Sequence, residues 1–196
     1  MSKADRTKAF IIEKSAPLFN KKGYAGTAIS DIIQATGLTK GAIYGNFENK
    51  DHIAIEAYHF NVNELGMKMR AMMSVKETAT DKLVAFAEFY RSDWHTFSER
   101  GGCPILNASV EADDSYPVLK KHVRNSILNL TNELAEVIEK GKAEGEFRKE
   151  LDAREYAYTF VTMIEGGIMM SKIMEKPALL DAAIDRVISM VRIEMT

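Results

Sequence analysis

The stretch Thr27-Ala-Ile-Ser-Asp-Ile-Ile-Gln-Ala-Thr-Gly-Leu-Thr-Lys-Gly-Ala-Ile-Tyr-Gly-Asn-Phe47 predicts two short helices joined by a tight turn. Thr27 is a favourable N-cap residue for the first helix, and Thr39 is a favourable N-cap residue for the second. The first helix has one apolar face, which is formed by Ile29, Ile32 and Ile33. Gly37 can take the left-handed conformation that ends a helix, and Leu38 can fill the corner between the two helices.

The outward face of the second helix is small, polar and basic at its start. It consists of Lys40, Gly41, Ala42, Tyr44, Gly45 and Asn46, opposite the apolar pair Ile43 and Phe47. Short side chains beside a positive helix N-terminus suit the major groove of DNA, where a helix can approach base edges and phosphates. A helical hairpin that only packs into a core would carry the same glycine, leucine and capping threonines, so that alternative stays open.

A wider set of residues in and around this stretch forms a pattern that is typical of a known family. These residues are Leu18-Phe19, Lys22-Gly23-Tyr24, Thr27, Asp31-Ile32, Ala35, Gly37-Leu38, Lys40-Gly41, Ile43-Tyr44, Phe47, Lys50 and Ile53. With these residues, the first quarter of the chain resembles the TetR family of bacterial transcriptional repressors. The sequence departs from the family at Gly45-Asn46, where the family often has a bulkier residue followed by His. Pro17 lies inside the first expected helix and should bend or loosen it.

The expected DNA-binding residues are Thr27, Ser30, Thr39, Lys40, Gly41, Ala42, Tyr44, Asn46 and Lys50. Tyr44, Thr39 and Lys50 are expected to position the protein on phosphates. Thr27 and Ser30 should add phosphate contacts from the preceding helix. Lys40 and Asn46 are the candidates for reading base edges.

Composition and charge are those of a globular protein with one positive end. The chain has 196 residues, of which 46% are hydrophobic and 28% are charged, with a net charge of −2. Residues 1–50 hold eight Lys/Arg and four Asp/Glu, a balance of +4, whereas the remainder is acidic. One cysteine excludes an intrachain disulfide, and no apolar run approaches the length of a membrane span. We therefore expect a cytoplasmic protein that is not bound to a membrane.

Helical periodicity continues after Lys50, and no run shows the alternation of a strand. The spacing predicts an all-α fold of about nine helices. Three would form a helix-turn-helix domain over residues 1–50, and six would form a helical ligand-binding and dimerisation bundle over residues 51–196. The expected bundle helices cover residues 49–73, 83–97, 104–114, 117–145, 152–174 and 177–191.

The bundle carries aromatic and methionine side chains, which are more often core residues than pocket residues. The resemblance implies a small effector in this bundle, of apolar or aromatic character. The candidate ligand-binding residues are Phe60, Phe86, Tyr90, Trp94, Phe97, Cys103, Asn107 and Met163. We expect neither a cofactor nor a metal ion.

The last two helices are expected to form a homodimer surface. Gly166-Gly167 lies within an apolar helical stretch, and glycine at such a place often marks a close backbone approach. The same stripe could instead close the core of one chain. A two-fold dimer would place two recognition helices on a palindrome with half-sites about one DNA turn apart.

Two further patterns remain open. The run Gly101-Gly-Cys-Pro-Ile-Leu-Asn107 resembles an element of TetR regulators that sense electrophiles or oxidants, with the Cys103 thiol at the start of a helix. His52, Glu56 and His59 share one helix face and have metal-compatible side chains, but no fourth ligand is evident. A small-molecule-binding helical enzyme is the alternative from another class, although the sequence has no recognisable catalytic spacing.

Overall fold

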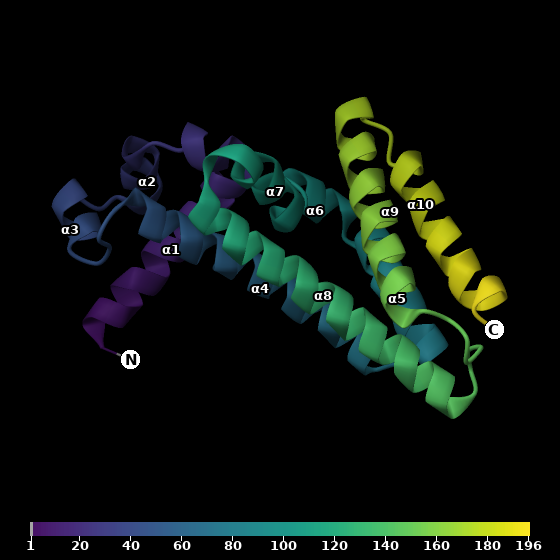
Figure 1. Cartoon of the computed structure of the whole chain (residues 1–196). Coiled ribbons are helices and arrows are strands. Elements are labelled where there is room, and N and C mark those ends of the chain that lie inside the picture. Colours follow the sequence, from purple (N-terminus) through teal and green to yellow (C-terminus); the bar gives the residue numbers. More distant parts are fainter. Residues whose placement is uncertain (1) are drawn as a thin grey trace. The chain divides into compact units, whose positions relative to one another are not determined.

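The computed structural model describes residues 2–196, and every regular element in that range is helical (Figure 1). The helices are α1 (Lys3–Gly26), α2 (Ile29–Thr36), α3 (Lys40–Tyr44), α4 (Lys50–Ser74), α5 (Ala79–Ser92), α6 (Trp94–Glu99), α7 (Pro104–Ser115), α8 (Pro117–Glu144), α9 (Ala153–Met174), α10 (Ala178–Ser189) and the π-helical η1 (Met190–Glu194). The predicted all-α fold class is confirmed.

One expected helix is divided into two. The apolar stripe predicted a single helix over residues 83–97, but α5 ends at Ser92 and α6 begins at Trp94. Asp93 lies between them with φ −107° and ψ 13°, outside the helical region. The stripe still packs together across this break, because the rings of Tyr90 and Phe97 meet edge to face at 5.8 Å. Periodicity therefore identified the buried face and missed the interruption in the backbone.

The chain forms two compact units. The first comprises the residues up to Leu65 together with Arg100–Arg124, and the second comprises Gly66–Glu99 and Asn125–Thr196. Helices α4 and α8 each contribute residues to both units. The division into domains at residue 50 stays a prediction.

The first unit is built on the long helix α1, which packs against α2 and α7. Its core contains the fully buried side chains of Ile11, Phe19, Ile32, Ile43, Ile53 and Tyr58. The non-helical residue inside α1 is Gly23, at φ 77° and ψ 173°, whereas the helix continues through Pro17. The bend therefore lies six positions beyond the expected one, because glycine accepts the positive φ that the kink requires.

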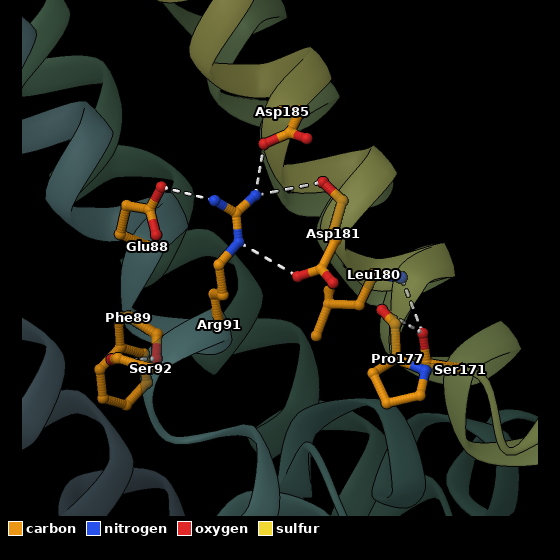
Figure 2. Close-up of polar contacts among 9 residues, drawn as sticks. All are labelled: Glu88, Phe89, Arg91, Ser92, Ser171, Pro177, Leu180, Asp181 and Asp185. Atoms are coloured by element: carbon orange, nitrogen blue, oxygen red, sulfur yellow. Dashed lines mark hydrogen bonds and ion pairs between the residues drawn. The ribbon is translucent and has the colours of Figure 1, made fainter.

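The second unit is held by the pair α9 and α10, which lie side by side along their length (Figure 1). Gly167 makes this approach possible, because a Cβ atom there would lie 2.9 Å from Cβ of Ala183. Ser171 on α9 caps the start of α10, since its Oγ accepts a hydrogen bond from the amide of Leu180 at 2.7 Å (Figure 2). The glycine pair thus predicted a close backbone approach correctly at Gly167, and the approach is to α10 of the same chain, so this part of the stripe closes the core of one chain.

An arginine from α5 joins this pair. The Arg91 guanidinium donates to the Asp181 carboxylate at 3.1 Å and to Glu88 at 2.9 Å, and it also pairs with Asp185 (Figure 2). Because Asp181 and Asp185 lie one turn apart on α10, a single guanidinium fixes both the position and the rotation of that helix against α5.

Candidate nucleic-acid interface

Helix α2 begins one residue later than expected. Its N-cap is Ala28, whose amide donates to the carboxylate of Asp31 at 2.9 Å. The same carboxylate accepts from Lys22 at 2.8 Å, and these two interactions, Lys22 first, hold the pKa of Asp31 below its usual value. Thr27 is therefore not the cap. It is fully buried and its hydroxyl donates to the Gly23 carbonyl at 2.6 Å, so that hydroxyl stabilises the turn and offers no surface to a phosphate.

The turn between α2 and α3 has the expected chemistry. Gly37 lies in the left-handed region at φ 69°, and its amide closes α2 by donating to Ile33 at 2.8 Å. Thr39 is the N-cap of α3, with Oγ1 accepting from the amide of Ala42 at 3.2 Å. The predicted glycine stop and the predicted second cap are both confirmed. These short-range hydrogen bonds end α2 and begin α3.

Helix α3 presents a shallow outward face. Thr39, Lys40, Gly41 and Tyr44 are exposed, as is Ser30 on α2, while Ala42, Asn46 and Lys50 are half-buried. A Cβ atom added to Gly41 would meet its nearest neighbour, Oγ1 of Thr39, only at 4.0 Å, so the surface there is open. The inward residues Ile43 and Phe47 are buried. The helix can therefore approach a flat or grooved partner without an obstructing side chain at its centre.

Besides Thr27 and Thr39, two more of the expected contact residues are engaged within the protein. Nδ2 of Asn46 donates to the carbonyl of Ala42 at 2.8 Å, and so caps the end of α3. The ammonium of Lys50 lies 3.5 Å from the Ala25 carbonyl, close to the start of α2. Both side chains still lie at the edge of the exposed face, where their contacts with DNA remain a prediction.

A supporting cluster under α3 was missed by the sequence analysis. The Lys8 ammonium lies 5.4 Å from the centroid of the Phe47 ring, and the His52 ring meets the same ring edge to face at 5.4 Å. Lys8 also pairs with Glu56 at 3.6 Å. Helices α1 and α4 thereby hold Phe47 from two sides. No local pattern could have found Lys8, because its partners are about 40 positions or more away.

The expected ligand-binding residues are distributed over both units. Phe86, Tyr90 and Phe97 are buried in the second unit and pack on one another, with Phe86 and Tyr90 at 5.7 Å. Trp94 is half-buried at the edge of this cluster, 6.5 Å from Phe97. These residues form a packed aromatic core, which is the alternative that the sequence left open, and a ligand would have to enter between them.

Two other residues of the expected ligand-binding set, Met163 and Phe60, line hollows outside this aromatic cluster. Met163 lines a surface hollow of about 540 Å³ along α9, together with Tyr158 and Thr162. In the first unit, Phe60 lines a second hollow of about 430 Å³ with Pro17 and Arg100. Met163 and Phe60 thus line two different hollows, one in each unit.

Cys103 and Asn107 belong to the first unit and have structural surroundings. Cys103 is the N-cap residue of α7 and its exposed fraction is 1%. Nδ2 of Asn107 donates to the carbonyl of Asn20 at 3.1 Å and to that of Gly101 at 2.9 Å. The Gly-Cys-apolar-apolar-Asn element therefore ties the start of α7 to helix α1.

The three metal-compatible residues of α4 do not act together. Nε2 of His52 lies 3.7 Å from Glu56, whereas Nε2 of His59 lies 2.9 Å from Nδ1 of His122 on α8. Burial, followed by the neighbouring His122, lowers the pKa of His59. His59 is thus paired across to a second helix rather than along its own.

A capped turn, an exposed short helix and a buried support for that helix define a helix-turn-helix DNA-binding protein. Residues 11–57 match the family described as bacterial regulatory proteins, tetR family, and residues 79–187 match the tetracyclin repressor-like C-terminal domain. The chain belongs to the TetR family of bacterial transcriptional regulators.

Solved structures and relatives agree with this assignment. A TetR-family regulator from Cytophaga hutchinsonii is 36% identical with a TM-score of 0.94, over 97% of this chain and 96% of its own. One from Chloroflexus aurantiacus is 35% identical with a TM-score of 0.90, over the same shares. The transcriptional repressor DhaR of Mycobacterium sp. (strain GP1) is 25% identical over 83% of this chain and 81% of its own.

Across residues 2–196, none of the helices combines the length and the apolar character that crossing a membrane requires.

Proposed function

We propose that this protein is a ligand-responsive repressor that binds a palindromic DNA operator as a homodimer and is released from it by a small apolar or aromatic effector. The observation that carries the proposal is the exposed face of α3, with Thr39, Lys40 and Tyr44 open to solvent above the buried residue Ile43. Phosphate contacts would come from Thr39, Tyr44, Lys50 and Ser30, and base-edge contacts from Lys40.

Exposed apolar side chains on α9 support the homodimer. Tyr158, Met169, Met170, Ile173 and Met174 are between 41% and 79% exposed. A helix rarely leaves this much apolar surface in water unless a partner covers it. A second copy of the same chain can cover it symmetrically, and the two-fold axis would then present two α3 helices to successive half-sites.

The aromatic cluster of the second unit supports an apolar effector. Phe86, Phe89, Tyr90 and Phe97 meet edge to face, so an aromatic ligand could replace one ring-to-ring contact with another. The effector weakens DNA binding only if it binds the DNA-free state more tightly than the DNA-bound state. By linkage, operator DNA must weaken effector binding by the same factor.

The test begins with DNA. Full-length protein should select, from a random duplex library, a palindrome whose half-sites lie about one helical turn apart. Mass measurement should show an even number of protomers on each duplex, and binding should weaken steeply with salt as phosphate counterions are released. The double variant Lys40→Ala/Tyr44→Ala should lose this binding, whereas Glu133→Gln, far along α8, should keep it. Selection of no duplex, or binding by one protomer to an asymmetric site, would contradict the proposal.

A second measurement tests the effector. Trp94 is the single tryptophan and lies at the edge of the aromatic cluster, so its fluorescence should change when an aromatic compound enters the unit. Compounds from an aromatic panel that change this fluorescence should release the selected duplex. Equal affinity of such a compound with and without the duplex would overturn the ligand-responsive part of the proposal.

A further inference from the structure

Two side chains of α7 bind the backbone of α1 at its kink. Oε2 of Glu111 accepts from the amide of Tyr24 at 2.6 Å, and Oε1 accepts from the amide of Ala25 at 2.8 Å. Four positions earlier on α7, Nδ2 of Asn107 donates to the carbonyl oxygen of Asn20 at 3.1 Å. Residues four apart on a helix lie on one face, so the two side chains reach α1 together. We call Asn107 and Glu111 the α7 clasp.

The clasp takes the place of helical hydrogen bonding at the kink of α1, and the pair Tyr24 and Asn20 shows how. In a continuous helix, the amide of Tyr24 would donate to the carbonyl of Asn20, its i−4 partner. Here the kink at Gly23 separates these two groups. Glu111 binds the amide, and Asn107 binds the carbonyl. Each half of the broken bond therefore has a charged or amide partner on α7, so the kink leaves neither of these part-buried backbone groups unpaired.

Two features of the kink require glycine at position 23, the backbone angle and the space beside it. Its φ of 77° lies in the region that favours glycine, and a Cβ atom would lie 2.8 Å from Oε2 of Glu111. Because Gly23 has no side chain, the Glu111 carboxylate has room to reach the backbone amides of Tyr24 and Ala25. Because glycine also adopts helical angles freely, the same residue would permit a continuous α1 if the clasp opened.

The kink sets the direction in which the chain enters the helix-turn-helix. Three residues separate Gly23 from Thr27, whose buried hydroxyl donates back to the Gly23 carbonyl. The Tyr24 ring is anchored beside them, stacked on Phe19 at 5.4 Å. A change of backbone angles at Gly23 would therefore rotate α2 and α3 relative to the rest of α1.

We propose that the α7 clasp is a positioning device for DNA binding, in which Asn107 and Glu111 hold α1 in its kinked form and so aim the recognition helix α3. When the clasp is closed, α3 has the orientation that fits the operator. When it opens, α1 can regain the bond between Tyr24 and Asn20, and α3 turns away. This inference rests on the proposed DNA-binding function and identifies α7 as the helix that controls it.

The experiment compares spacing preference and affinity. The palindrome selected by the wild-type protein is made in versions with one or two base pairs added to or removed from its centre. Glu111→Ala, Glu111→Gln and Asn107→Ala are measured in the full-length protein against Glu133→Gln, an exposed glutamate that pairs with Arg70 at 3.2 Å. Thermal unfolding checks that each variant is folded.

We expect the wild-type protein and Glu133→Gln to share a sharp preference for one spacing. Glu111→Ala and Asn107→Ala should bind the best duplex about tenfold more weakly and should distinguish the spacings less. Glu111→Gln, which keeps one acceptor oxygen and the shape of the side chain, should show an intermediate loss. If the alanine variants do not fold, the spacing preference of Glu111→Gln alone tests the inference.

A merely structural role would lower the folded fraction and leave the spacing preference unchanged, so an unchanged preference in Glu111→Gln and in the folded alanine variants overturns the inference. If the wild-type protein binds the palindrome and the clasp variants show the same affinity and spacing preference, the proposed function stands and the inference about the clasp falls. If the wild-type protein selects no duplex, both fall.

Discussion

Nδ2 of Asn46 donates a hydrogen bond to the carbonyl of Ala42 at 2.8 Å, and so closes the C-terminal end of the recognition helix with a side chain of the turn that follows. Helix α3 spans only Lys40–Tyr44, so few hydrogen bonds lie within it and a side-chain contact at its end adds to them. Asn46 therefore has a local structural role at the end of α3.

Asn46→Ala should weaken DNA binding to every duplex by a similar factor. The lost cap contact is worth about 1 kcal/mol, which corresponds to about fivefold in affinity. Lys40→Ala, in contrast, should change the preferred base at one position. Selection from a random library with each variant measures both effects. An altered sequence preference in Asn46→Ala would show that Asn46 reads a base edge, as the sequence first suggested.

Gly167→Ala should destabilise the protein by about 1–3 kcal/mol, because its Cβ would lie 2.9 Å from Cβ of Ala183 and 3.2 Å from Cα of Leu180. Gly166→Ala is the matched control. A Cβ atom there meets nothing within 4 Å, so alanine should stabilise α9 by about 0.5–1 kcal/mol through helix propensity. Chemical denaturation at one fixed protein concentration measures both, since a dimer's stability depends on concentration. Equal effects of the two substitutions would contradict the packing of α9 on α10.

Arg91→Ala should lower the free energy of unfolding by about 1 kcal/mol, because Arg91 joins α5 to two carboxylates of α10 while remaining partly exposed to solvent (Figure 2). Lys140→Ala removes a pair within one helix, Lys140 with Glu144 at 3.6 Å, and should cost only a few tenths of a kcal/mol. Urea titrations of the two variants give the comparison. A loss no larger than that of Lys140→Ala would mean that solvent screens the Arg91 cluster almost completely.

The pair of His59 and His122 predicts loss of stability in mild acid. Burial first, and then His122, lowers the pKa of His59 below its ordinary value of 6.5, while Glu56 opposes this shift. The unfolded chain therefore binds a proton more readily than the folded chain. The stabilisation from neutral His59 is complete above about pH 6.5 and is lost as the pH falls toward the lower pKa of the folded state.

The measurement is the free energy of unfolding at about pH 7.5 and about pH 5.5. The wild-type protein should lose more stability between these values than His59→Gln does. His95→Gln, whose parent side chain is 87% exposed, should behave like the wild-type protein. An identical pH dependence in all three proteins would show that His59 does not titrate differently on folding.

Cys103 should resist modification in the native protein. Its side chain is 1% exposed at the start of α7, so a maleimide should react quickly only after unfolding. Cys103→Ser should keep DNA binding. Rapid modification of the native thiol, accompanied by release of DNA, would instead favour the electrophile- or oxidant-sensing alternative.

The local features of the helix-turn-helix could be predicted from the amino-acid sequence. The end of α2 at Gly37 depends only on the backbone freedom of that one residue. The start of α3 after Thr39 depends only on a hydroxyl that lies three positions from the amide it binds. The apolar faces of the long helices were likewise readable, since a period of 3.6 residues reports which side of a helix is buried. The same local reasoning misplaced the α2 cap by one residue, because the Thr27 hydroxyl found a backbone partner at Gly23.

Which helix faces pack against each other depends on contacts between residues that are far apart in the sequence. The partners of the clasp, Glu111 and Tyr24, lie 87 positions apart, and His59 and His122 lie 63 apart. Periodicity gives the direction of a side chain and not the helix that it faces, so the predicted ligand set proved to be divided between two units. Local hydrogen bonding thus specified the DNA-binding turn, while long-range packing determined how α1 is bent beneath it and which side chains hold that bend.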